Sequence, residues 1–153
     1  MPPSYVLPHT NPRITLDIHT PLDQTTILPL SFTGAIIDGL QYLLLHVIDL
    51  GHNVPIPAEG AFFAVGRMSV VATSANEAAG DVLDCFTLGL VLNRIWSLVT
   101  RHGYRTWDFD VLRGGPVAQV RKIGTVSILY TPNDLSETKK FGEKSNSRVS
   151  NAR

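Results

Sequence analysis

The chain has little that would support chemistry based on a metal or a cofactor. Only one of its 153 residues, Cys85, is a cysteine, so no disulfide can form within the chain. Basic and acidic residues number 13 each, which leaves no net charge to attract nucleic acid or an anionic membrane. A Walker loop, a dinucleotide fingerprint, HExxH, paired CxxC and GxSxG are all absent. We therefore expect no metal, no cofactor and no nucleic-acid partner.

Two further absences concern location. The N-terminal residues lack the basic group and apolar run of a secretory signal, so a cytoplasmic protein is expected, although a mature form with its leader removed would look the same. Residues 27–50 are apolar enough to suggest a membrane span, but they include Asp38, His46 and Asp49. Such groups are costly to place in hydrocarbon. A core-facing helix of a globular protein explains this segment better, and we expect no membrane span.

The composition predicts a single domain with a short arm and a tail. At 44% apolar residues, a chain of this length can bury one core. Residues 1–12 hold four prolines and no periodicity, which predicts an extended N-terminal arm. Residues 13–132 carry the periodic patterns and form the predicted domain. Residues 133–153 are polar and too poor in apolar side chains to build a core, so this tail is expected to be disordered.

Apolar periodicity predicts two helices. The first spans residues 33–50, with Thr33 as its N-cap and Gly51 after its last turn. The second spans residues 81–102 and is preceded by Ser74 and Glu77 at the spacing of a capping box.

Alternation and β-branched residues predict the strands. Residues 13–19 alternate apolar and polar side chains, and residues 61–73 favour strand, with a bulge or a hairpin turn at Gly66-Arg67. Residues 104–112 and 117–130 are expected to pair as a hairpin around the turn at 113–116.

Two segments of the chain match each other when the sequence is compared with itself. Gly39-Leu40 aligns with Gly89-Leu90 at an offset of 50, and residues 65–73 align with residues 123–131. An internal duplication of a helix-strand unit explains this match, although amphipathic segments with similar caps would imitate it. The predicted fold is an α+β two-layer sandwich, with two helices on one face of a mostly antiparallel sheet.

The second half of the chain resembles small fungal proteins in which a helix containing Gly-Leu precedes strands ending in a Val-Gly-x-x-x-Leu type run. The matching residues are Gly89-Leu90, 107–111 and 123–128. The expected architecture is also similar to that of the killer-toxin-like effectors, which are α/β sandwiches. Those proteins are usually secreted and rich in disulfides, and this chain departs from both features. The resemblance implies no catalytic residues here.

Candidate catalytic residues come from two segments. Asp108 and Asp110 share one side of their strand, where paired carboxylates can divide acid and base work. The alternative is that both face water while the intervening apolar residues fill the core. His46 is a candidate base, with solvent exposure or a hydrogen bond to Asp38, Tyr42 or Asp49 as the alternative.

Candidate ligand-binding residues lie on the two predicted helices. Asn93, Arg94 and Trp96 interrupt the apolar part of the second helix, and Tyr42 lies one turn before His46 on the first. A polar group within an apolar helix can orient a ligand in a pocket, or can mark the solvated side of that helix.

Two functions follow from these residues. In the first, the domain binds a small apolar molecule and is a cofactor-free enzyme for rearrangement, cyclisation or isomerisation. In the second, it is a non-catalytic protein-interaction module, effector-like or an assembly subunit. A homodimer is compatible with both. Convergence of the candidate side chains would favour the first function, and an exposed apolar patch over a filled interior would favour the second.

Overall fold

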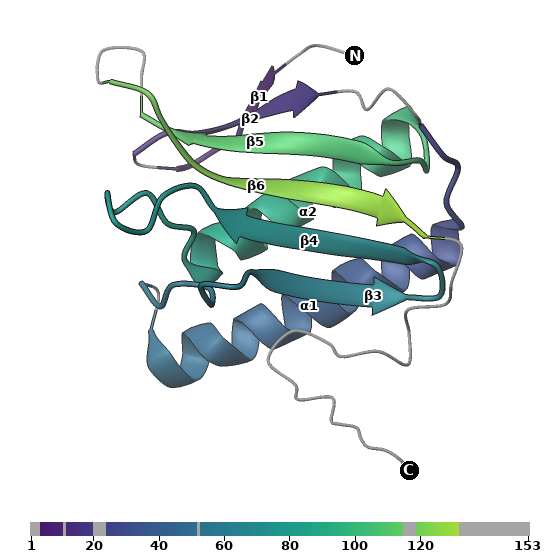
Figure 1. Ribbon diagram of the computed structural model, residues 1–153, viewed down its shortest axis with the longest axis horizontal. Helices are drawn as coiled ribbons and strands as arrows, with labels where there is room; N and C mark the ends of the chain where they lie inside the picture. The colour runs from purple at the N-terminus through teal and green to yellow at the C-terminus, as the bar shows by residue number, and fades with distance from the viewer. Residues whose placement is uncertain (1–3, 11, 20–23, 52, 115–118, 132–153) are drawn as a thin grey trace.

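The computed structural model describes residues 4–10, 12–19, 24–51, 53–114 and 119–131 (Figure 1). The described residues contain two helices and six strands. In chain order these are β1 (Ser4–Val6), β2 (Ile14–His19), α1 (Pro29–Leu50), β3 (Ala61–Val65), β4 (Met68–Ser74), α2 (Cys85–His102), β5 (Trp107–Arg113) and β6 (Arg121–Tyr130).

The six strands form one antiparallel sheet in the order β1-β2-β5-β6-β4-β3. Both helices lie on the same face of this sheet, and the described residues place no helix on the other face (Figure 1). The predicted α+β two-layer architecture is therefore confirmed. Part of the N-terminal arm adds the edge strand β1, which pairs with β2. The predicted disordered tail at 133–153 lies outside the described residues.

The core lies between the sheet and the helices. Along β5, Trp107, Phe109 and Val111 are buried, because alternate side chains of a strand point to the same face of the sheet. Asp108 and Asp110 consequently lie on the face without helices, and both are partly exposed. The chain turns at Gly66-Arg67 between β3 and β4, so the hairpin alternative for these residues is the one observed.

Helix α1 begins at Pro29, four residues before the predicted start, and Leu28 rather than Thr33 is its N-cap. Proline suits the first turn, because its ring sets a helical φ and its missing N–H has no partner there. The helix ends at Gly51, whose φ of 100° favours glycine, as predicted.

Helix α2 begins at Cys85, because the carboxylate of Asp84 caps it by accepting the backbone N–H of Thr87 at 2.7 Å. The predicted capping box at Ser74 and Glu77 is wrong. Ser74 ends β4 instead, and its hydroxyl oxygen accepts the N–H of Leu83 at 3.0 Å. The Ser74 hydroxyl therefore accepts from a backbone N–H in the loop before α2, and not from an N–H in the first turn of a helix.

The order helix, strand, strand occurs twice, as α1-β3-β4 and as α2-β5-β6. The last strands of the two units, β4 and β6, pair with each other, and Val70 lies opposite Ile128. This order is compatible with the predicted duplication but is not proof of it, so the duplication stays a hypothesis.

Candidate functional site

Helix α1 buries one side and exposes the other. Phe32, Ala35, Ile36, Gly39 and Leu43 are buried against the rest of the protein. The opposite side carries a row of five exposed residues, which we call the α1 stripe: Leu30, Ile37, Gln41, Leu44 and Ile48. Of its aliphatic side chains, Leu30 is 86% exposed, Ile37 47%, Leu44 60% and Ile48 68%.

The sequence predicts a core-facing helix here, and the exposed row shows that only one side of α1 faces the core. Apolar residues occur around most of α1, but the sheet and α2 cover only one side. Ile36 and Leu43 are buried, whereas Ile37 and Leu44, one residue further along, are exposed. Each residue turns the helix by about 100°, so neighbours in sequence reach different surroundings.

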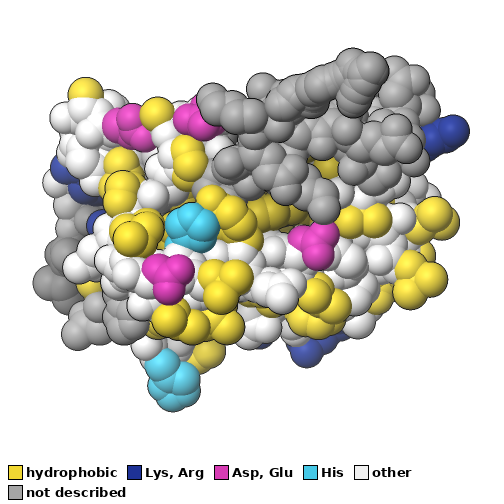
Figure 2. Space-filling view, turned by 90° about the horizontal axis from the view of Figure 1, so that it is seen from below, with side chains coloured by type: hydrophobic (Ala, Val, Ile, Leu, Met, Phe, Trp, Pro, Cys, Tyr) yellow, Lys and Arg dark blue, Asp and Glu magenta, His cyan; other side chains and the backbone are white. Residues whose placement is uncertain are grey.

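The apolar surface extends beyond the α1 stripe. Leu28, Leu45 and Leu50 are also more than half exposed. Together with the stripe they give α1 a series of exposed aliphatic side chains, and large exposed apolar patches often mark binding sites. Figure 2 views the molecule from the side of α1 and β3 and shows hydrophobic side chains spread along this face, with acidic side chains and a histidine among them.

Helix α1 has the length and composition of a membrane-spanning helix, and 28% of its most apolar 18-residue window is buried. The buried residues of α1 show how this helix packs. Phe32, Ala35, Ile36 and Leu43 belong to the same core cluster as the sheet residues, so α1 packs as part of the domain.

The ionisable groups of α1 lie beside the stripe. Asp38 and Asp49 are exposed, His46 is half-buried, and the helix contains no lysine or arginine. His46 Nδ1 donates to the carbonyl oxygen of Tyr42 at 3.0 Å, and the two rings stack with centroids 3.9 Å apart. Burial, and to a smaller extent the nearby Cys85, raises the pKa of Tyr42. A hollow of about 340 Å³ lies here, lined by Tyr42, Leu45, His46, Asp49 and Leu50.

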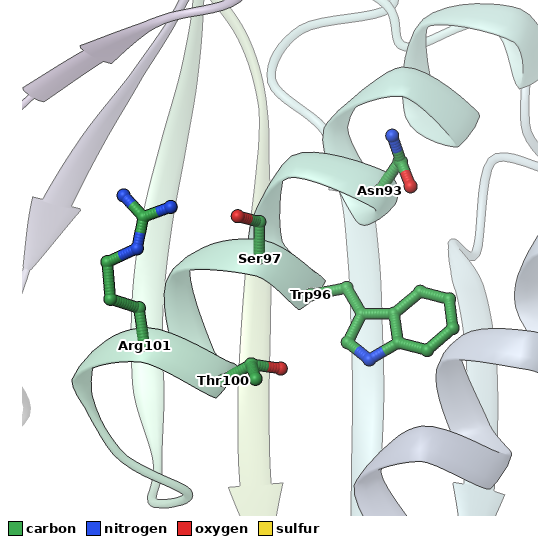
Figure 3. Close-up of a pocket in the computed structure, with 5 residues that line it drawn as sticks. All are labelled: Asn93, Trp96, Ser97, Thr100 and Arg101. Carbon is green, nitrogen blue, oxygen red and sulfur yellow. The ribbon is translucent and has the colours of Figure 1, made fainter.

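Asn93 and Trp96 share a second hollow, of about 510 Å³, on the outer side of α2. Its other lining residues are Ser97, Thr100 and Arg101. Figure 3 shows that the Trp96 ring and the Arg101 guanidinium point to opposite sides of the helix, so the polar groups do not converge on one point. Arg94 is not part of this hollow, because its guanidinium lies 5.2 Å from the centroid of the Tyr5 ring.

The two candidate aspartates lie on the face of the sheet without helices, across the sheet from His46. The Asp110 carboxylate contacts two side chains, His19 through Nε2 at 2.8 Å and Lys122 through Nζ at 3.1 Å. The cross-strand partner of Asp108 on β2 is His19, and that of Asp110 is Asp17. The candidate catalytic residues Asp108, Asp110 and His46 therefore do not form one site.

The structure also forms a hollow that the sequence did not predict, about 540 Å³ in volume at the start of α2. It combines His9, Asn53, Asp84 and Arg113 with apolar side chains, among them Phe86. These segments are distant in sequence and share no motif, so only the fold brings them together. His9 has a φ of 59°, a left-handed conformation that is uncommon for residues other than glycine.

Among the described residues, no three histidine, cysteine, aspartate or glutamate side chains are grouped closely enough to hold a metal ion. Comparison of the chain with protein-family models, with curated proteins and with solved structures finds no match. The resemblance to killer-toxin-like effectors therefore stays a prediction based on the residues quoted for it.

Proposed function

We propose that this protein is a non-catalytic interaction module that binds a protein partner through the α1 stripe and the leucines beside it. The observation that carries this proposal is the row of exposed aliphatic side chains along a 22-residue helix whose opposite side is fully packed. Leaving so much aliphatic surface in water is unfavourable, and a partner that covers it gains that free energy.

The dispersal of the candidate catalytic groups supports this choice over an enzyme. General acid-base catalysis needs its groups within hydrogen-bond reach of one substrate. Asp108 and Asp110 lie on the sheet face without helices, whereas His46 lies on α1 and already donates to a backbone carbonyl. No substrate could contact both groups at once through the intervening sheet.

The charges of α1 favour a protein partner over a membrane surface. Helices that lie in a membrane interface usually carry lysine and arginine on their polar side, where these contact lipid headgroups. Helix α1 instead has no lysine or arginine, and its acidic residues are Asp38 and Asp49.

Photo-cross-linking within cells that produce the full chain tests the proposal. A photoreactive amino acid at position 44 is expected to yield a protein adduct of defined mass, because Leu44 belongs to the stripe and is 60% exposed. The matched control places the same residue at Val120, which is 52% exposed but precedes β6. Adducts at position 120 with none at position 44 would overturn the proposal.

A second candidate function is the binding of a small apolar molecule at the hollow of Asn93 and Trp96, whose volume of about 510 Å³ suits such a ligand. Native mass spectrometry of protein purified from its own host would detect a retained molecule. This function would be supported if Trp96→Leu no longer retained the molecule while His19→Gln, a change on the far side of the sheet, still did. A mass that matches the bare chain would count against it.

A further inference from the structure

We infer that the hollow at the start of α2 is a binding site for a free α-amino acid with an apolar side chain. In this assignment the carboxylate of the ligand binds Arg113, its ammonium group binds Asp84, and its side chain lies against the apolar wall of the hollow. The hollow shares no residue with the α1 stripe, so the inference goes beyond the proposed function and does not depend on it.

Four separate parts of the chain form this hollow of about 540 Å³: the N-terminal arm with the start of β2, the loop after α1, the start of α2 and the end of β5. Backbone hydrogen bonds hold these parts together. Cys85 N–H donates to the carbonyl oxygen of Val54 at 2.8 Å, and Gly114 N–H donates to that of Arg13 at 2.9 Å. The volume and the fixed walls are those of a site for a small molecule.

Asp84 presents one oxygen to the hollow. Its Oδ1 accepts the N–H of Thr87 at 2.7 Å and caps α2. Its Oδ2 lies 4.0 Å from Nη2 of Arg113, which is longer than a hydrogen bond. An ammonium group bound at Oδ2 would give this oxygen the close partner that Arg113 does not provide.

Arg113 lies in the same hollow, and its side chain is 35% exposed. Its neighbour across the strands, Arg121, shows the contrast: that guanidinium holds Asp81 through two hydrogen bonds of 2.8 Å. Arg113 has no comparable bond to Asp84. The planar guanidinium matches the two oxygens of a carboxylate, so a ligand carboxylate would complete at Arg113 the pairing that Arg121 already has.

The two side chains together select a ligand that carries both charges. A simple carboxylic acid at Arg113 would place its carboxylate beside that of Asp84, and a simple amine at Asp84 would lie beside the guanidinium. Like charges at such distances disfavour both ligands. An α-amino acid carries its ammonium and carboxylate groups on one carbon atom, so it can contact two protein groups that are 4.0 Å apart.

The rest of the wall suits an apolar side chain. Ile14 of β2 and three residues around the start of α2, Val82, Phe86 and Leu90, line this part of the hollow. Phe86 and Leu90 are four residues apart on α2 and therefore lie on one side of the helix. Phe86 is 42% exposed, so a ligand that covers its ring gains the free energy of removing apolar surface from water.

His9 supplies a further polar group from the N-terminal arm. Its φ of 59° makes it the one non-glycine residue with a left-handed backbone among the residues that the structure describes. Glycine would adopt this conformation with no steric cost, and unfavourable backbone conformations occur preferentially at ligand sites. The imidazole lines the hollow, where it can form a hydrogen bond with the ligand.

NMR titration of the ¹⁵N-labelled full chain with L-phenylalanine and with L-leucine tests the site. The amide signals of Thr10, Val82 and Leu90 should shift together, with a dissociation constant on the order of 0.01–1 mM for a ligand of this size. The absence of any shift at these positions with either amino acid up to about 10 mM would overturn the inference.

Two analogues test the pairing of charges. Phenylpropanoate lacks the ammonium group of phenylalanine, and phenethylamine lacks its carboxylate. Each should bind at least about 10-fold more weakly than L-phenylalanine, because one of the two charged groups of the protein is left without its partner. Phenylpropanoate that binds as tightly as L-phenylalanine would overturn the role of Asp84, and with it the assignment of an amino acid.

Variants test the residues. Arg113→Gln and Asp84→Asn should each raise the dissociation constant for L-phenylalanine at least about 10-fold, and Asp84→Asn keeps an oxygen that can cap α2. Arg67→Gln, at the exposed turn between β3 and β4, is the matched control and should bind as the wild type does. His9→Gly should weaken binding without lowering the melting temperature, which a purely structural role of His9 would not produce. Wild-type affinity in Arg113→Gln would overturn the inference.

Discussion

Arg121 holds Asp81 through two hydrogen bonds of 2.8 Å, which tie the first residue of β6 to the turn that precedes α2. The hydrogen bonds from Arg121 are the main cause that lowers the pKa of the Asp81 carboxyl. A bidentate pair of this kind joins two segments 40 residues apart in the sequence.

This pair should make stability depend on pH in the acid range. Because the pKa of Asp81 is lower in the folded state, the pair stabilises the fold above the ordinary carboxyl pKa. That contribution is lost as the pH falls through the lowered folded pKa. Asp81→Asn should therefore melt at a lower temperature than the wild type at pH 7, with the difference shrinking towards pH 3. A difference that stays constant across thermal melts at these pH values would refute this role.

Gly124 should be replaceable only at a cost in stability. A Cβ added there would overlap the side chain of Leu83 and lie 2.6 Å from the carbonyl oxygen of Thr73. Gly124→Ala should lower the free energy of unfolding by about 1–3 kcal/mol, as overpacking does. Gly89→Ala is the matched control, because it lies within α2 with no atom near the added Cβ, and should raise stability by about 0.5–1 kcal/mol. Urea denaturation measures both, and similar effects of the two substitutions would contradict the packing described.

Asp84 should stabilise the start of α2 as its N-cap. Removing the acceptor in Asp84→Ala leaves the N–H of Thr87 without its side-chain partner and should cost about 0.5–2 kcal/mol in urea denaturation. Asp84→Asn keeps an acceptor oxygen and should cost much less. An equal loss in both variants would instead assign the effect to the charge of Asp84, whose carboxylate lies 4.0 Å from Arg113.

Cys85 should react slowly with thiol reagents in the native protein. Its side chain is buried, and burial followed by the nearby Asp84 carboxylate raises the pKa of the thiol, so little reactive thiolate forms at neutral pH. We expect labelling by a disulfide reagent to be at least about 100-fold slower at pH 7 than in urea-unfolded protein. Comparable rates in the two states would show that the start of α2 opens readily.

Local patterns were enough to predict most elements of this fold. The alternation along residues 107–111 predicts that Trp107 and Phe109 face the core and Asp108 faces water, because a strand repeats every two residues. Helix starts were harder to predict. Both Ser74 and Thr33 have the chemistry of an N-cap, but the tertiary structure placed other residues, Asp84 and Leu28, at those positions.

The relative positions of the candidate site residues depended more strongly on tertiary structure than the helices and strands did. Asp110 and His46 are both polar residues in otherwise apolar segments, yet the fold places them on opposite sides of the sheet. The hollow around His9 and Arg113 draws on segments about 100 residues apart, so no local spacing could reveal it.

The sequence by itself determined that residues 33–50 belong to an apolar helix and that the fold is an α+β sandwich, because periodicity and turn residues act locally. Only the tertiary structure decided which of its apolar residues are buried. Periodicity describes the helix alone, whereas burial depends on what packs against it. The sheet and α2 cover Ile36 and Leu43, and nothing among the described residues covers Leu44 and Ile48. That exposed row is the basis of the proposed interface.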